Sequence, residues 1–95
     1  MTDPRIEQLA HNLIHFSCDL KAGERVLIEA TGEVQELTRA LVREAYKAGA
    51  VPFVWNNRPD VTRELALGAT KEQQMLRARV DGLLMDAMQA YIGLR

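Results

Sequence analysis

Cysteine, proline and aromatic side chains are all scarce in this sequence. Cys18 is the single cysteine among 95 residues, there are three prolines, and aromatic residues make up 5% of the chain. One cysteine excludes an intrachain disulfide and a cysteine-rich metal site. It also favours a cytoplasmic protein, since thiols stay reduced in that compartment. No repeat, low-complexity tract or linker divides the chain.

The sequence also lacks an excess of charge of either sign and a long hydrophobic run. Its 12 Lys and Arg residues against 13 Asp and Glu residues give a net charge of −1. We therefore predict no binding to nucleic acid or to an anionic membrane. The apolar runs are too short for a membrane span, and the polar start MTDPRIEQ is unlike a secretion signal.

What the chain does contain is a central strand–helix–strand pattern. Residues 25–30 read RVLIEA, an apolar run typical of a strand covered on both faces. Residues 34–48 carry apolar side chains at helical spacing, and Gly49 is placed to end that helix. A second strand follows over residues 51–55, at the sheet edge because Pro52 cannot donate a ladder hydrogen bond. A helix between two strands makes them parallel neighbours.

Further helices and one more strand flank this centre. Asp3 and Pro4 open a first helix, whose predicted apolar face consists of Ile6, Leu9, Ala10, Leu13, Phe16 and Ser17. Residues 60–67 form a second short helix, and another begins at Thr70, with a break near Gly82. In that last helix we expect a buried stripe of Leu76, Val80, Leu83 and Ala87. Residues 90–94, AYIGL, are typical of a third strand.

These elements predict an α/β fold. The sheet is short and parallel, with about three strands in the order 2-1-3 and helices on both faces, as in part of a Rossmann-like domain. We expect residues 1–95 to form a single α/β domain. In a doubly wound fold a helix would follow the last strand, so we expect the chain to be the N-terminal part of a larger protein.

His11 and His15 are the first candidate site. They stand four residues apart on a predicted helix, which is a metal-ligand spacing. Asn12 follows His11, so the general-base Glu of an HExxH metalloprotease motif is absent. Both histidines project away from the predicted apolar face, and we interpret them as solvated surface residues. We therefore assign no metal-binding residue.

The loop at residues 29–33 is the second candidate, because it follows a strand and opens a helix, where α/β folds bind ligands. It holds one glycine rather than a GxGxxG pattern, and Glu29 and Glu33 would repel phosphate. We interpret Gly32 as a tight turn and assign no cofactor-binding residue. A phosphorelay receiver would need an Asp at the end of the third strand, and residues 90–94 contain none.

Three further side chains carry no catalytic assignment. Ser17 and Cys18 lack a neighbouring base in the sequence, so neither fits an activated nucleophile. Trp55 is interpreted as a core or interface residue rather than a stacking platform. The sequence thus yields no catalytic residue.

Four segments, in order, carry a family resemblance: MTDPRIEQLAHNLI, LKAGERVLIEATGE, VREAYKAGAVPFV and DAMQAYIGLR. In these the chain resembles the N-terminal region of the thermophilic metalloproteases, the aminopeptidase T and aminopeptidase S group. That family similarly has a D-P-R-I-like helix start, a K-x-G-(D/E)-x-V-L-I-E strand and an R-E-A-Y/L-x-A-G-A helix end. A later A-x-A-Y-I precedes a further strand. The resemblance extends over essentially the whole chain.

The resemblance implies a parent enzyme that removes N-terminal residues from peptides by metal-assisted hydrolysis. It implies two divalent metal ions, held by Glu, His, Tyr and Asp ligands in a C-terminal half. None of those motifs lies within residues 1–95, so we expect this segment to be inactive by itself. Its implied role is to support the catalytic half and to share in subunit contacts.

Two other functions remain open from the sequence. One is a non-catalytic α/β interaction or oligomerisation module that assembles through its unfinished sheet. The other is a small-ligand-binding domain that uses the loop at Thr31 and Gly32. For a homo-oligomer we expect the contact at Tyr91, Ile92 and Leu94, joined by Met85 and Met88.

Overall fold

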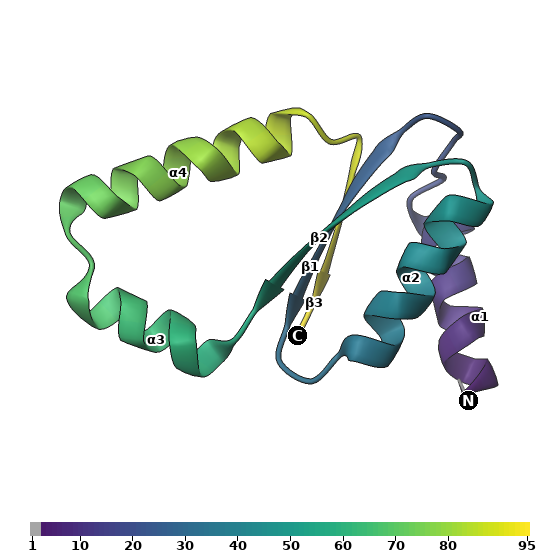
Figure 1. The fold of residues 1–95 in the computed structure, drawn as a ribbon. Helices are drawn as coiled ribbons and strands as arrows, with labels where there is room; N and C mark the ends of the chain where they lie inside the picture. The colour runs from purple at the N-terminus through teal and green to yellow at the C-terminus, as the bar shows by residue number, and fades with distance from the viewer. Residues whose placement is uncertain (1–2) are drawn as a thin grey trace.

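The fold is built on a three-stranded parallel sheet, which a computed structural model describes together with the rest of residues 3–95. The chain runs in the order α1 (Pro4–Asn12), a π-helical turn (Leu13–Ser17), β1 (Arg25–Thr31), α2 (Gln35–Lys47), β2 (Val51–Asn57), α3 (Pro59–Gly68), α4 (Lys71–Asp86) and β3 (Ala90–Leu94). The strands lie in the order β2-β1-β3, with β1 in the centre (Figure 1). The predicted α/β class, strand order and parallel pairing are confirmed.

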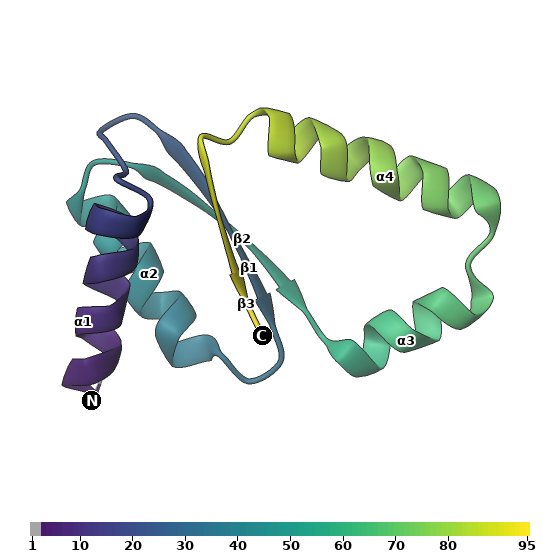
Figure 2. The same ribbon diagram turned by 180° about the vertical axis from the view of Figure 1, so that it is seen from behind.

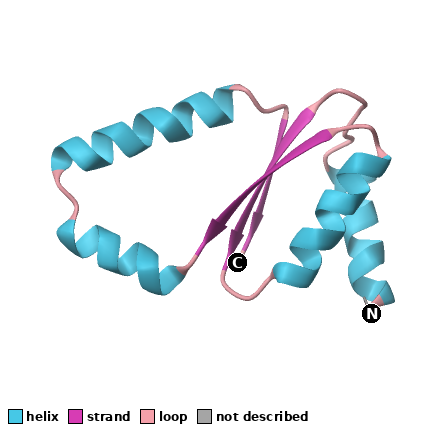
Figure 3. Cartoon of the chain, in the orientation of Figure 1, coloured by secondary structure: helices cyan, strands magenta, loops and turns pink. Residues whose placement is uncertain are grey.

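The hydrophobic core lies between one face of the sheet and the layer formed by α1 and α2 (Figure 3). Val26 and Ile28 of β1 point into it, and so do their neighbours on β3, because paired residues of parallel strands share a face. The fully buried Leu41 of α2 and Ile14 of the π-helical turn fill the space opposite the sheet. The apolar spacing of α2 predicts this burial correctly.

The first helix packs through part of the predicted face, since Ala10 is in the core and Ile6 and Leu13 pack against it. Ala10 and Ile14 are fully buried, whereas Leu9 and Phe16 are exposed. Phe16 lies in the π-helical turn, where the Cys18 N–H bonds to the Leu13 carbonyl at 2.9 Å, five residues back. This wider turn shifts the side chains that follow it relative to an ideal α-helix. The prediction that placed Leu9 and Phe16 on the buried face is wrong.

Helices α3 and α4 form an arm on the side of the sheet opposite α1 and α2 (Figures 1 and 2). Neither helix has a buried residue. The Cα radius of gyration is 14.9 Å, whereas a compact chain of this length has about 12 Å. The two helices therefore extend the molecule instead of covering the sheet closely.

The expected buried stripe of α4 is wrong in consequence. Leu76, Val80 and Leu83 are exposed, Leu83 by 75%. The predicted break near Gly82 is also wrong, because α4 is continuous from Lys71 to Asp86. Glycine costs only about 1 kcal/mol in a helix interior relative to alanine. The predicted cap is present, since Thr70 accepts a hydrogen bond from the Gln73 N–H at 3.1 Å.

The third strand has the predicted bounds, but its side chains are placed differently from the oligomer hypothesis. Ile92 and Leu94 face the core and are buried. Tyr91 points to the other side of the sheet, where it is 45% exposed. The expected self-association contact through Ile92 and Leu94 is therefore wrong, because these side chains already contribute to the core of one chain.

Candidate functional sites

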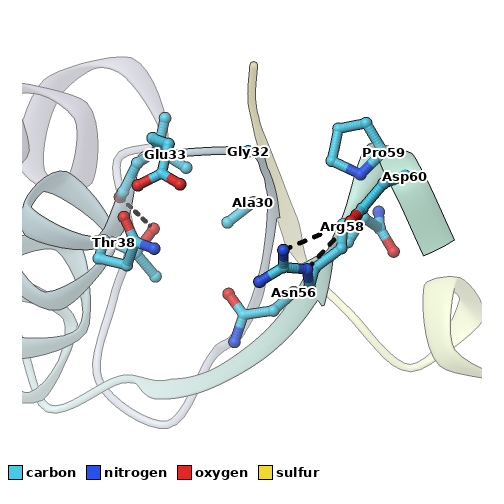
Figure 4. Close-up of a pocket in the computed structure, with 11 residues that line it drawn as sticks. Ala30, Gly32, Glu33, Thr38, Asn56, Arg58, Pro59 and Asp60 are labelled. Atoms are coloured by element: carbon cyan, nitrogen blue, oxygen red, sulfur yellow. Dashed lines mark hydrogen bonds and ion pairs between the residues drawn. The ribbon is translucent and has the colours of Figure 1, made fainter. Parts of the chain in front are cut away.

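The first candidate site is a pocket of about 290 Å³ at the carboxyl ends of β1 and β2. Parallel strands bring their carboxyl ends to one edge, where α/β folds place ligands. Figure 4 shows Glu33 and Thr38 on one side, Asn56 and Arg58 on the other, and Ala30 between them. The sequence indicated the first side of this pocket, and the second comes from the parallel pairing of β1 with β2.

Gly32 makes the turn at this pocket. Its φ of +83° lies in the left-handed region that disfavours other residues, and its N–H bonds to the Asn57 carbonyl at 3.2 Å. The predicted tight turn is thus present. Its backbone N–H is engaged by the neighbouring strand end, which is a structural role.

Several polar groups of the pocket are already paired within the protein. The Thr38 hydroxyl donates to the Val34 carbonyl at 2.7 Å. The Arg58 guanidinium lies 3.4 Å from the Asp60 carboxylate and holds the pKa of Asp60 below its usual value, assisted by the Val61 N–H. No activated nucleophile or metal-ligand group lines the pocket in the described residues.

A second pocket of about 230 Å³ lies where the end of α4 approaches the open face of the sheet. Glu29 is its central polar group, and it accepts hydrogen bonds from the Tyr91 hydroxyl and, at 2.9 Å, from the Asn57 amide. The bond to Glu29 raises the pKa of Tyr91, and burial raises it further. Trp55 also lines this pocket, and the guanidinium of Arg77 lies 4.1 Å from its ring centroid. Trp55 therefore holds the arm to the sheet.

The third candidate is a cluster of His11, His15 and Glu44 between the first helical segment (α1 and the π-helical turn, residues 4–17) and α2. His11 Nδ1 lies 3.4 Å from Glu44 Oε2, and His15 Nε2 lies 3.2 Å from the same oxygen. The imidazole rings are 4.3 Å apart between centroids. Within residues 3–95, this is the group of three His, Cys, Asp or Glu residues whose geometry could hold a metal ion.

The three side chains of this cluster differ in their exposure to solvent. The side chain of Glu44 is 7% exposed, that of His15 31% and that of His11 46%. Burial alone would raise the pKa of Glu44, but its contacts with Lys47 and the imidazoles outweigh burial and leave that pKa lowered. The interpretation of both histidines as solvated surface residues is wrong for His15, which is partly buried against Glu44. The spacing of the two histidines was visible in the sequence, whereas Glu44 lies 29 residues from His15 and carried no signal.

The thiol of Cys18 is not an activated nucleophile. Cys18 is partly buried, and burial raises the pKa of its thiol, which lowers the thiolate fraction available for reaction. Among the described residues, no helix is both long and apolar enough to cross a membrane.

A parallel α/β sheet with polar groups at its strand ends defines the class of the fold, and comparison with known proteins defines the family. The profile of the thermophilic metalloprotease (M29) family matches residues 2–92, and the chain belongs to that family. A similar solved structure is wild-type AmpT from Thermus thermophilus, with a TM-score of 0.62 and 27% sequence identity. The similarity covers 73% of this chain and 18% of the AmpT chain. No curated protein matches the sequence.

The family name, metalloprotease, implies a metal ion. Two imidazole nitrogens and a carboxylate oxygen, as in the His11–His15–Glu44 cluster, are ligands that Zn²⁺ takes in proteins. The cluster thus fits a metal ion by its chemistry. Its residues line neither of the two pockets.

Proposed function

We propose that this chain is the N-terminal α/β segment of a metal-dependent aminopeptidase, and that it is not catalytic by itself. The observation that supports this most is the family match over residues 2–92, combined with a span of only 18% of AmpT. Aminopeptidase activity, hydrolytic removal of N-terminal residues from peptides, is thus proposed for the whole enzyme. The two catalytic divalent metal ions and the peptide-binding site would belong to the rest of that enzyme.

The chemistry of residues 3–95 favours a structural role over a catalytic one. Metal-assisted hydrolysis needs a metal with an open position, a positioned base and a shaped cavity that excludes water. Among the described residues, the strand-end pocket holds no group of three His, Cys, Asp or Glu side chains that could bind a metal ion, and the His11–His15–Glu44 cluster lies outside both pockets. The α/β core, by contrast, offers a folded platform for a neighbouring domain. We also propose a cytoplasmic location, which the single Cys18 supports.

The proposal is tested by an aminopeptidase assay on the purified 95-residue chain, with leucyl substrates and added cobalt, zinc or magnesium. We expect no release of leucine above the rate with metal alone. A double variant, His11→Ala with His15→Ala, is the control. Metal-dependent turnover that disappears in this variant would overturn the proposal that the segment is non-catalytic.

A second proposed function is assembly into a homo-oligomer, and the exposed arm favours it. Apolar side chains are exposed along both helices of the arm: Val61, Leu65, Leu67, Met75, Leu76, Val80, Leu83 and Met85. Apolar surface gathered in this way marks interaction sites more often than free surface, and a second copy, related by two-fold symmetry, is the commonest partner.

Sedimentation equilibrium at micromolar concentration tests this second function. We expect a dimer that Leu83→Lys dissociates, whereas Arg39→Ala on the exposed side of α2 leaves it unchanged. A substitution in the third strand, such as Ile92→Lys, would not test the dimer contact. That side chain is buried in the core, and its loss would unfold the chain. A monomeric parent chain would contradict the proposal.

A further inference from the structure

Between α1 with its π-helical turn and α2, one carboxylate oxygen of Glu44 lies close to a ring nitrogen of His11 and to one of His15. In a tetrahedral zinc site, bonds of about 2.0–2.2 Å place neighbouring ligand atoms roughly 3.3–3.5 Å apart. Glu44 Oε2 lies 3.4 Å from His11 Nδ1 and 3.2 Å from His15 Nε2. All the ligand atoms lie within 4.8 Å of one another. We propose that His11, His15 and Glu44 bind one Zn²⁺ ion.

The ligand types select the class of metal. Two imidazoles and one carboxylate suit Zn²⁺ and its neighbours Co²⁺ and Ni²⁺, whereas Mg²⁺ and Ca²⁺ prefer shells made of oxygen. Three protein ligands leave a fourth position for water. His11 is 46% exposed, so this position opens towards solvent and an ion can enter without unfolding the chain.

The ligands are held in place before any ion arrives. Ala10 and Ile14, both fully buried, fix the first helical segment against α2. The π-helical turn contains His15 and brings its ring over that of His11, with centroids 4.3 Å apart. Sites on packed helices keep ligand geometry better than sites on loops. Such a site binds without first ordering its ligands.

Glu44 supplies the second element of preorganisation. Its side chain is 7% exposed, and a buried carboxylate needs partners for both oxygens. Lys47 Nζ lies 3.3 Å from Oε1 and engages that oxygen, which leaves Oε2 to the two imidazoles. The positive charge of Lys47 also repels a bound Zn²⁺ ion, so we expect micromolar rather than tighter affinity for Zn²⁺. The bound ion would link the first helical segment to α2 within the helical layer that covers the sheet.

The inference is independent of the proposed aminopeptidase role, and the test does not use activity. The 95-residue chain, free of any histidine tag and stripped with a chelator, is titrated with ZnCl₂ in a calorimeter and with CoCl₂ by visible absorption. We expect one ion per chain, a Co²⁺ spectrum of nitrogen and oxygen ligands, and a higher melting temperature with Zn²⁺. Mg²⁺ and Ca²⁺ should leave the melting temperature unchanged. In NMR spectra, Zn²⁺ should move the ring signals of both His11 and His15.

Variants distinguish a metal site from a hydrogen-bonded cluster. His11→Ala, His15→Ala and Glu44→Gln should each weaken Zn²⁺ binding by more than about tenfold, since even outer-shell changes cost that much. Glu7→Gln, which removes a carboxylate on the same helix paired with Arg43, should bind as the parent does. Circular dichroism without metal verifies that each variant is folded. The absence of Zn²⁺ binding by the folded parent chain would overturn the proposal, and so would binding that survives in the folded His11→Ala, His15→Ala double variant.

Discussion

At the scale of single residues, the side chains of α2 divide sharply between its buried and exposed faces. Leu41 is fully buried among the sheet and the first helix, whereas Arg43, two positions on, reaches solvent and pairs with Glu7 at 2.8 Å. Burial of a leucine side chain contributes about 1.5–3 kcal/mol, and an exposed ion pair contributes about 0–1 kcal/mol. The stability of the domain therefore depends on the buried face.

We predict that Leu41→Ala lowers the free energy of unfolding by about 2–5 kcal/mol, because it leaves a cavity in a packed core. Arg43→Ala, the matched control on the same helix, should cost less than about 1 kcal/mol. Urea melts of both variants measure the difference. Similar losses in the two variants would mean that α2 packs through another face.

The pKa of the Tyr91 hydroxyl depends on its contact with Glu29 in the second pocket. Its hydrogen bond to the Glu29 carboxylate favours the neutral phenol and raises the pKa of Tyr91 above 10.0. An acid whose pKa is raised in the folded state stabilises the fold below its unfolded pKa, and this contribution is lost as pH rises through the folded pKa. The chain should therefore lose stability in alkali, above about pH 10.

In a Tyr46→Phe background Tyr91 is the single remaining tyrosine, because the chain has two. We predict that ultraviolet absorbance then titrates with a pKa above the ordinary value of Tyr. Adding Glu29→Gln should lower that pKa, since the amide cannot attract the phenolic proton as a carboxylate does. A titration that Glu29→Gln leaves unaltered would show that the two side chains do not meet in solution.

At the scale of elements, the sequence predicts β1, α2, β2 and β3 well, because their signals are local. Apolar runs, helical spacing and Gly49 after the helix each act within a few residues. The exposure of Phe16 and the burial of α4 were not predictable in the same way. The exposure of Phe16 depends on the π-helical turn at residues 13–17, and the burial of α4 depends on whether other residues pack against the arm.

The same distinction applies to the candidate sites. The spacing of His11 and His15 is a local pattern, but their neighbour Glu44 comes from another helix and is brought close by packing. Likewise, Gly32 marked one side of the strand-end pocket, whereas Arg58 lies on the other side through the pairing of β1 with β2. Half of each site was visible in the sequence, and tertiary contacts supplied the other half.

The arm provides a prediction about an element. Leu83 of α4 is 75% exposed, so Leu83→Ala at high dilution should change the free energy of unfolding by less than about 0.5 kcal/mol. Leu41→Ala, the same chemical change in the core, is the matched comparison. Guanidinium melts at low protein concentration measure both. A loss at Leu83 as large as that at Leu41 would mean that α4 is covered within a single chain.

At the scale of the whole molecule, the domain combines one well-packed face and one open face. The core lies on the α1 and α2 side of the sheet, and the arm lies on the opposite side (Figure 2). The second pocket lies where α4 of this arm approaches the sheet. In the proposed role, the open face would be the surface on which a neighbouring domain or a second copy packs. This arrangement fits the proposed role as a supporting segment of a larger enzyme.

The most direct test of that role is a graft into AmpT from Thermus thermophilus. Leucine release from leucyl substrates is measured for intact AmpT, for AmpT without its aligned N-terminal segment, and for AmpT that carries this chain in its place. We predict that the deletion abolishes turnover and that the graft restores it, because the shared fold supplies the same support. A folded graft that binds its catalytic metals but releases no leucine would contradict the account, as would a deletion variant as active as intact AmpT.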